Sequence, residues 1–230
     1  RSRDLRAKGM DVVSMTVGEP DFDTPENIQH AATDAMRAGF THYSPVMGIP
    51  ELRSALSRKL KAENGLDYGA AEICVANGAK QAIANAILSI IEAGDEVIML
   101  APFWVSYEIT VRFAGGTPVV LHAGVEEDYK VPARRIAEAI TPRTKLIILN
   151  SPSNPTGALW TRPELEEIAA LVKSHPRLMV LSDEIYEYII FGGEMVSIGA
   201  LPGMRERTIT VNGFSKGFAM TGWRLGYAAA

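Results

Sequence analysis

The sequence predicts an α/β fold built around a sheet whose strands are covered on both faces. Short apolar runs alternate with longer amphipathic segments along the chain, which is the pattern of α/β architecture. Several of these runs are nearly continuous in Val, Ile and Leu, as in strands that are buried on both sides. Hydrophobic residues make up 47% of the 230-residue chain and charged residues 22%, which is enough to build a substantial core.

Seven candidate strands are short apolar runs bounded by polar or turn-forming residues. In chain order they cover residues 72–75, 96–100, 118–121, 146–149, 179–182, 208–211 and 224–228.

Helices are predicted between these strands. Apolar residues at positions 79, 82, 83, 86, 87, 90 and 91 follow a 3.6-residue period, and Gly94 then follows as a stop signal. Thr161 is the predicted N-cap of another helix, because Pro163 follows it at a position typical of a first turn. Residues 23–26 open a third helix.

The chain has no internal repeat, low-complexity tract or long linker. We therefore expect one domain over residues 1–230, with residues 1–20 belonging to an N-terminal segment. Residues 1–6 form a charged helical pattern with no apolar stretch after it, so no secretory signal is predicted. The chain lacks an initiator methionine and stops directly after an apolar run, so both ends look cut from a longer protein.

Charge and cysteine content exclude several classes of protein. The net charge of −4 provides no electrostatic footprint for nucleic acid or an anionic membrane. No segment approaches the ~20 apolar residues of a membrane helix. The single cysteine, Cys74, lies in an apolar run and is expected to be a small buried side chain. A reducing compartment, the cytoplasm, is the simplest prediction, and no metal site is predicted.

Polar residues gather at the carboxyl ends of four predicted strands. Ligands collect at this edge of an open α/β sheet, so we expect the clusters to converge on one site. The clusters are residues 77–80, 150–157, 183–186 and 212–216, after the first, fourth, fifth and sixth strands.

Lys216 is the most informative of these residues. It lies in the segment 212–224, which contains three glycines, directly after Ser215 and eight residues before Arg224. An amine beside a hydroxyl and a guanidinium can hold an aldehyde cofactor covalently while its neighbours bind a phosphate. This combination suits an aldehyde-bearing pyridine phosphate.

Other residues at strand ends could contact the ring nitrogen, the phenolic oxygen, the phosphate and the ring face of such a cofactor. Asp183 can face the ring nitrogen, and Asn154 and Tyr186 can donate to the phenolic oxygen. Backbone N–H groups at the helix start 78–80 form an anion site. Trp104, which follows the second strand, can flank the ring. Each residue alone has a structural alternative, such as a cap, a turn or core packing, so the prediction rests on their combination and order.

With these motifs in view, the chain resembles a class I/II aminotransferase of the aspartate aminotransferase superfamily, the pyridoxal-phosphate enzymes of fold type I. The resemblance covers essentially all 230 residues. It implies a three-layer α/β/α large domain with a mixed, mostly parallel seven-stranded sheet, and it implies that the C-terminal small domain is missing from this chain. The matching stretches are residues 18–25, 43–45, 48–53, 77–82, 101–107, 150–157, 182–186 and 215–227.

The resemblance also implies roles for individual residues. Lys216 resembles the Schiff-base lysine that shuttles the substrate proton, and Asp183 resembles the partner of the ring nitrogen of pyridoxal 5'-phosphate. Tyr186 and Asn154 resemble the donors to its phenolic oxygen, and Trp104 resembles the aromatic residue that flanks it. The phosphate would bind Ser215, Arg224 and the helix start formed by Gly78, Ala79 and Lys80.

Substrate and partner residues are implied in the same way. Gly18 resembles a backbone position near the substrate carboxylate, where Asn154 and Trp104 also lie. Lys80 resembles a lysine that faces the distal carboxylate of aspartate or glutamate. Tyr43 resembles a tyrosine that reaches the phosphate from a neighbouring subunit, which implies a homodimer with shared sites. The implied reaction is transamination between an amino acid, aspartate being the best guess, and 2-oxoglutarate.

Two other functions fit parts of the sequence. A pyridoxal-phosphate-dependent carbon–sulfur lyase would share Lys216 and Asp183, but several such lyases carry histidine where Tyr186 stands. An aminotransferase-like ligand-binding domain of a transcriptional regulator is the second alternative, against which the lack of a basic helical segment and the presence of Lys80 argue. Because the family's small domain carries the arginine for the substrate α-carboxylate, this chain is expected to bind cofactor without full activity.

Overall fold

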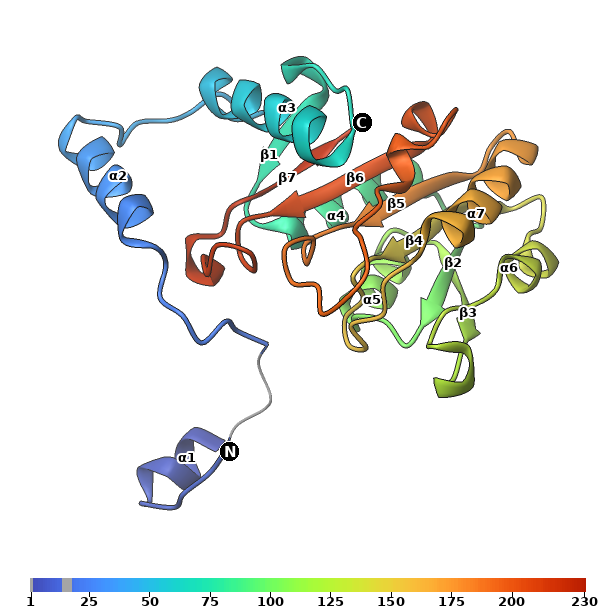
Figure 1. Ribbon diagram of the computed structural model, residues 1–230, viewed down its shortest axis with the longest axis horizontal. Coiled ribbons are helices and arrows are strands. Elements are labelled where there is room, and N and C mark those ends of the chain that lie inside the picture. The colour runs from blue at the N-terminus through green and yellow to red at the C-terminus, as the bar shows by residue number, and fades with distance from the viewer. Residues whose placement is uncertain (1, 14–17) are drawn as a thin grey trace.

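The computed structural model describes residues 2–13 and 18–230 and contains a single seven-stranded sheet (Figure 1). Across the sheet the strands run in the order β1-β7-β6-β5-β4-β2-β3. Their bounds are β1 Ile73–Ala76, β2 Glu96–Ala101, β3 Thr117–His122, β4 Thr144–Asn150, β5 Met179–Asp183, β6 Thr208–Gly213 and β7 Gly226–Ala229.

The sheet is mixed and mostly parallel, as predicted. Neighbouring strands from β3 through β6 pair in parallel, whereas β7 is antiparallel to both β6 and β1. Because β7 runs backwards, its amino end lies at the edge where the other strands have their carboxyl ends. Residues just before β7 therefore reach the same edge as residues just after β5 and β6.

All seven predicted strands are present, and the first and the last begin later than predicted. The predicted first strand included Glu72, but this residue ends a 3₁₀ turn, in which its side chain accepts a hydrogen bond from the Gly69 N–H at 2.8 Å. The predicted last strand began at Arg224, which instead has a left-handed backbone with φ of 54°. These turns delay both strands until Ile73 and Gly226.

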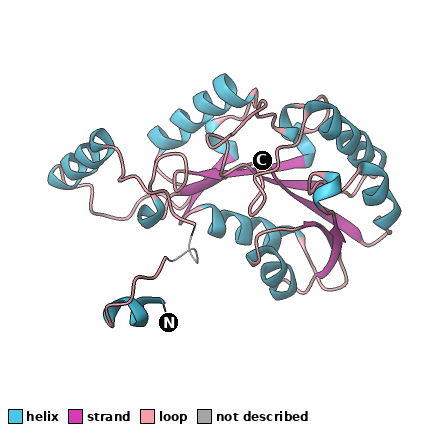
Figure 2. Ribbon diagram, turned by 60° about the horizontal axis from the view of Figure 1, so that its bottom comes forward, coloured by secondary structure: helices cyan, strands magenta, loops and turns pink. Residues whose placement is uncertain are grey.

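Helices cover both faces of the sheet, which makes the three layers that the sequence predicts (Figure 2). Alternate residues of β4 point to opposite faces: Leu146 and Ile148 pack with α4 and α5, and Ile147 and Leu149 pack with α6 and α7. A third cluster lies under α3. The helices are α1 Ser2–Ala7, α2 Glu26–Arg37, α3 Pro50–Asn64, α4 Ala79–Ile90, α5 Ser106–Phe113, α6 Ala133–Ala139 and α7 Arg162–Ser174.

The predicted helix signals are found at the observed helix ends. Thr161 caps α7 in a capping box with Glu164, whose Oε2 accepts from the Thr161 N–H at 2.7 Å. Helix α4 begins after Gly78, and Gly94 follows its end with φ of 96°. Cys74 is only partly buried, contrary to expectation, because β1 lies at an edge of the sheet.

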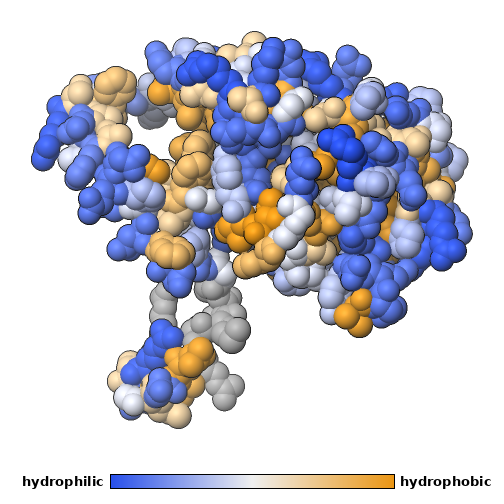
Figure 3. Space-filling model, viewed as in Figure 1, coloured by the Kyte–Doolittle hydropathy of each residue, from blue (hydrophilic) through white to orange (hydrophobic). Residues whose placement is uncertain are grey.

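The N-terminal part of the chain extends away from the sheet (Figure 1). Helix α2 has no buried residue, and apolar side chains along this segment stand among polar ones on the surface (Figure 3). Exposed apolar residues between α2 and α3 are Phe40, Tyr43, Val46, Met47 and Ile49. Within the described part of the chain, no helix has the length and apolar character needed to cross a membrane.

Candidate active site

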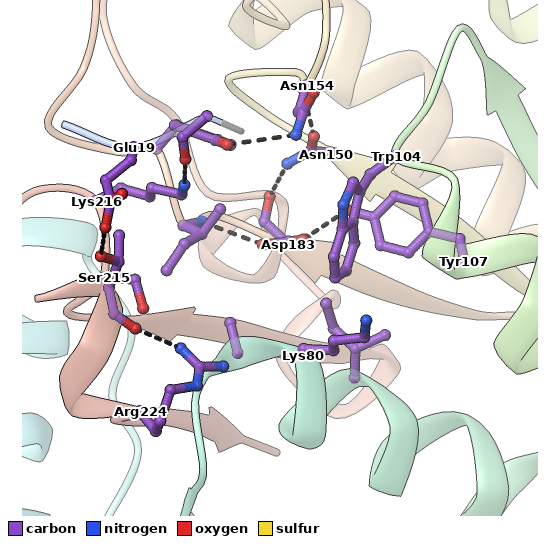
Figure 4. Close-up of a pocket in the computed structure, with 16 residues that line it drawn as sticks. Glu19, Lys80, Trp104, Tyr107, Asn150, Asn154, Asp183, Ser215, Lys216 and Arg224 are labelled. Carbon is purple, nitrogen blue, oxygen red and sulfur yellow. Dashed lines mark hydrogen bonds between the residues drawn. The ribbon is translucent and has the colours of Figure 1, made fainter. Parts of the chain in front are cut away.

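A cavity of about 420 Å³ opens at the edge of the sheet where the polar clusters were expected to converge (Figure 4). All four clusters contribute residues to its wall, and Trp104 and Arg224 contribute from the segments after β2 and before β7. It is lined by Gly18, Glu19, Ala79, Lys80, Ile83, Trp104, Tyr107, Asn150, Asn154, Asp183, Ile185, Tyr186, Ser215, Lys216, Thr221 and Arg224.

Asp183 ends β5 at the floor of this cavity and is only 3% exposed. The Tyr107 hydroxyl donates to its Oδ2 at 2.5 Å, and the Ile185 N–H donates to its Oδ1 at 3.2 Å. Burial raises the pKa of Asp183 to about 6, although these two hydrogen bonds act in the opposite direction. Both donors are neutral, so no positive charge balances the Asp183 carboxylate. A cation in the cavity would therefore strongly favour its ionised form.

Lys216 approaches the cavity from the loop after β6 (Figure 4). Its Nζ donates a hydrogen bond to the Gly18 carbonyl and lies 5.7 Å from the centre of the Tyr186 ring. Burial lowers the pKa of Lys216, and the positive charge of Arg224 adds to this effect while Glu19 opposes it. A larger fraction of this amine is therefore neutral, and so nucleophilic, than for a solvated lysine.

Asn154 and Tyr186 lie beside each other, as the sequence suggested. The Asn154 Nδ2 donates to the Tyr186 hydroxyl at 3.3 Å, and its backbone N–H donates to the Asn150 Oδ1 at 2.7 Å. Asn150 in turn donates to the Asp183 carbonyl at 2.9 Å. The loops after β4 and β5 are thereby held together, and burial raises the pKa of Tyr186 so that its hydroxyl stays a donor.

Arg224 lies over the amino end of α4. Its Nη1 donates to the Thr221 carbonyl at 2.8 Å and its Nη2 donates to the Asn77 carbonyl at 3.4 Å. A Cβ at Gly78, where φ is 80°, would lie 2.5 Å from Nη2, so only glycine leaves room for this guanidinium. Within residues 2–13 and 18–230, no carboxylate lies within ion-pair distance of Arg224.

Two sources of positive potential therefore meet at this end of the cavity. The guanidinium is one, and the free N–H groups in the first turn of α4 are the other. Ser215 lines the same wall and adds a hydroxyl. This arrangement is suited to an anion such as a phosphate.

Lys80 and Trp104 form the wall on the opposite side of Asp183 from Lys216 (Figure 4). The Lys80 Nζ lies 5.4 Å from the centre of the Trp104 ring, which stands edge-on to Tyr107 at 5.5 Å. The indole thus presents a flat apolar surface beside a primary amine.

Tyr43 is the one predicted site residue that lies away from the cavity of its own chain, and it is fully exposed. Gly78 does not line the cavity but makes the space that Arg224 occupies. The sequence reasoning overlooked Tyr107, Glu19 and Thr221. Tyr107 had a usable signal, because it follows Trp104 by three residues at a helix start and so shares its face.

The family model of aminotransferase class I and II matches residues 10–230. The chain belongs to this family. Among curated members, a bifunctional aspartate aminotransferase and glutamate/aspartate-prephenate aminotransferase of Petunia hybrida is 52% identical over 96% of the chain. An aspartate/prephenate aminotransferase of Cereibacter sphaeroides is 48% identical over 100% of the chain.

Solved structures of family members have the same fold. The aspartate aminotransferase of Thermus thermophilus with maleate superposes over 100% of the chain with a TM-score of 0.96 and 48% identity. An aromatic aminotransferase of Pyrococcus horikoshii superposes over 99% with a TM-score of 0.93 and 45% identity. The chain spans 59% and 62% of these two proteins, and 46% and 58% of the Petunia and Cereibacter relatives.

Proposed function

We propose that the chain is the cofactor-binding large domain of a pyridoxal-phosphate-dependent aminotransferase that acts on aspartate and a 2-oxo acid, with 2-oxoglutarate as the expected acceptor. The observation that carries the proposal is one cavity with three matched features. It has a positive end at Arg224 and α4, a buried acid at Asp183, and a lysine of lowered pKa at Lys216.

The residues present fit this cofactor. Its phosphate would be held by Arg224, Ser215 and the first turn of α4, where Gly78 leaves a cradle that any side chain would fill. Asp183, which has only neutral donors, would receive the protonated ring nitrogen. Asn154 and Tyr186 would donate to the phenolic oxygen, and Trp104 would pack on the ring. When bound, the cofactor supplies an aldehyde for amine exchange and a ring that accepts electrons.

Lys216 carries the proton transfers in this proposal. Its Nζ is the amine that would bond to the cofactor aldehyde and that the substrate amine would displace. The released amine is held close by the Gly18 carbonyl and the Tyr186 ring. Because its pKa is lowered, more of the amine is in the neutral form that can remove the substrate α-proton. The same amine would then deliver this proton to the cofactor.

The expected substrate is a dicarboxylic amino acid. Lys80 places a primary amine at the cavity wall beside Trp104, where it can pair with a distal carboxylate. The names of the Petunia and Cereibacter relatives, and the maleate named with the Thermus structure, support a dicarboxylate substrate.

A visible absorption spectrum of the purified protein with pyridoxal phosphate tests the proposal. We expect an absorption band that requires Lys216 and that is lost when aspartate is added, because the amine of aspartate replaces Nζ. The Lys216→Ala variant should lack the band.

The matched control is Lys61→Ala, which removes a surface lysine paired with Asp67 at 2.9 Å and should leave the band unchanged. A band that survives Lys216→Ala would reject the assignment of the cofactor lysine. A Lys216-dependent band that ignores aspartate would mean that this chain is a cofactor domain without a working substrate site, and it would leave the cofactor assignment standing.

A homodimer with shared sites is the proposed assembly. Its support is the exposed apolar surface between α2 and α3, which includes Tyr43, a residue that lies outside its own cavity. The single cysteine supports the proposal of a cytoplasmic location.

A further inference from the structure

The ring of Tyr188 packs directly on Gly217, the residue that follows Lys216. A Cβ built on Gly217 would lie 2.5 Å from the Tyr188 Cδ2 and 3.3 Å from its Cγ. Gly217 is not one of the glycines with positive φ, so its backbone accepts any residue. The glycine is therefore required by the tyrosine ring and not by the turn itself.

Aromatic residues on both sides of Lys216 complete this packing. Phe214 and Phe218, two residues before and two after the lysine, have ring centres 5.6 Å apart. Phe218 stands edge-on to Tyr188 at 5.5 Å, and Phe214 contacts Tyr227 of β7 at 6.3 Å. The outer side of the lysine loop thus rests on a cluster of four aromatic rings.

Helix α3 anchors Tyr188 from the other side. The Tyr188 hydroxyl donates to the Glu63 Oε2 at 2.5 Å, and the Lys59 Nζ lies 5.3 Å from the ring centre. Lys59 also pairs with the neighbouring Glu187 at 2.5 Å, and Glu187 is only 8% exposed. The ring is therefore held by side chains from a helix that contributes nothing to the cavity wall.

The turn after β5 reaches both sides of the lysine loop. Tyr186 lies on the cavity side, 5.7 Å from the Lys216 Nζ, and Tyr188 lies against Gly217 on the outer side. Hydrogen bonds from the Ile189 N–H to the Tyr186 carbonyl at 2.8 Å, and from the Glu187 N–H to the Glu184 carbonyl at 3.0 Å, keep this turn compact.

From this geometry we propose that Tyr188 is a positioning residue: held by α3, its ring on Gly217 sets the place of the Lys216 amine in the cavity. The proposal rests on the proposed function in that Lys216 is the reacting amine. Tyr188 is 47% exposed, but its hydrogen bond to Glu63 and its edge-on contact with Phe218 hold the ring in place. A methyl group at Gly217 would therefore displace the loop that carries Lys216. Displacement by about 1 Å of a reacting group is enough to cost up to about 10²-fold in rate.

Chemical labelling of Lys216 in the cofactor-free protein tests this role directly. Trinitrobenzenesulfonate reacts with neutral amines, and peptide mass spectrometry gives the rate at Lys216, with Lys61 as the internal reference. In Gly217→Ala the methyl group displaces the loop. The Lys216 amine, which lies near the charges of Glu19 and Arg224 and beside the Tyr186 ring, then becomes less buried. Its labelling rate at pH 8, relative to its own plateau rate at high pH where the amine is fully neutral, should fall about threefold, because the loss of burial raises the pKa of Lys216.

The decisive comparison adds the same methyl group to a protein that lacks the Tyr188 ring. Gly217→Ala should have no effect on labelling in a Tyr188→Ala background, because the atom that excludes the methyl group is gone. Gly192→Ala is the matched control, since a Cβ there meets nothing within 4 Å.

An unchanged or higher ratio of the pH 8 rate to the plateau rate in Gly217→Ala would overturn the proposal, as would an equal fall of this ratio in the presence and absence of Tyr188. Thermal unfolding of each variant verifies that it is folded. Because the labelling needs no cofactor, it still gives an answer if the protein fails to bind pyridoxal phosphate, so the two proposals fail separately.

Discussion

Asp183 is a residue whose position lowers the stability of the cofactor-free protein. Its folded-state pKa of about 6 lies above its ordinary value of 3.8, so the folded state holds the proton more tightly than the unfolded state does. The contribution of Asp183 to stability is therefore most favourable at acidic pH and becomes less favourable as the pH rises from about 4 through 6. The full difference is about 3 kcal/mol above that range.

Replacing Asp183 with asparagine should remove this pH-dependent loss. Without cofactor, Asp183→Asn should be more stable than the unchanged protein at pH 7.5, by up to about 3 kcal/mol, and by about half as much at pH 5. Urea unfolding at the two pH values measures the difference. The variant should also bind pyridoxal phosphate more weakly, because no carboxylate faces the ring nitrogen.

Glu184 provides the matched control for this prediction. Burial raises its pKa to about 7, and its side chain is fully buried away from the cavity, with Ser182 and Ser197 donating to its Oε1. Glu184→Gln should therefore raise stability at pH 7.5 in the same way while keeping the cofactor band. An equal gain of Asp183→Asn at pH 5 and pH 7.5 would contradict the ionisation argument.

At the scale of elements, the contact between β7 and α4 builds the anion end of the cavity. A Cβ on Gly226 would lie 2.3 Å from the Ala79 nitrogen and 2.5 Å from the Gly78 carbonyl carbon. These are backbone atoms, which cannot yield as a flexible side chain would. The close approach puts Arg224, two residues before Gly226, over the first turn of α4.

Gly226→Ala should therefore weaken both the fold and anion binding. Overpacking of this kind costs about 1–3 kcal/mol, which urea unfolding measures. Inorganic phosphate should raise the melting temperature of the unchanged protein but raise that of Gly226→Ala much less. Gly94→Ala is unsuitable as a control because of its positive φ, so Gly192→Ala serves again. An unaltered response to phosphate would show that the β7–α4 contact does not shape the anion site.

At the scale of the whole molecule, the segment between α2 and α3 exposes apolar side chains that a partner would cover. We expect the protein to sediment as a dimer in which Tyr43 completes the site of the partner. Tyr43→Phe should weaken pyridoxal phosphate binding by about tenfold or more, because a hydroxyl bonded to a charged phosphate is lost.

Hybrid dimers give the sharpest form of this test. A Lys216→Ala subunit supplies Tyr43, and a Tyr43→Phe subunit supplies Lys216, so each random hybrid holds one intact site. Co-refolding the two variants should restore tight binding at about a quarter of all sites. Restoration of none would mean that Tyr43 serves its own chain or no site at all.

The order of the elements and the membership of the site were predictable from local patterns. Short apolar runs marked all seven strands, and Thr161 with Pro163 marked the start of α7. Residues at strand ends, such as Asp183 and Lys216, could be grouped because parallel strands end at one edge. These signals are short-range or depend on a general rule of sheet topology.

The contacts that tune those residues could not be predicted, because they join segments far apart in the chain. Tyr107 donates to Asp183 from 76 residues away, and no local pattern marks that pair. The antiparallel direction of β7, which brings Arg224 to the site, is likewise a property of strand pairing.

The sequence by itself determined the elements, the family and the chemical groups at the sheet edge, since periodicity and motif spacing are written along the chain. Only the tertiary structure decided the environment of those groups. Burial raised the pKa of Asp183 and lowered that of Lys216, and the Tyr188 ring took the space beside Gly217. Desolvation and steric exclusion depend on every neighbour in three dimensions, so they exist only after the chain has folded.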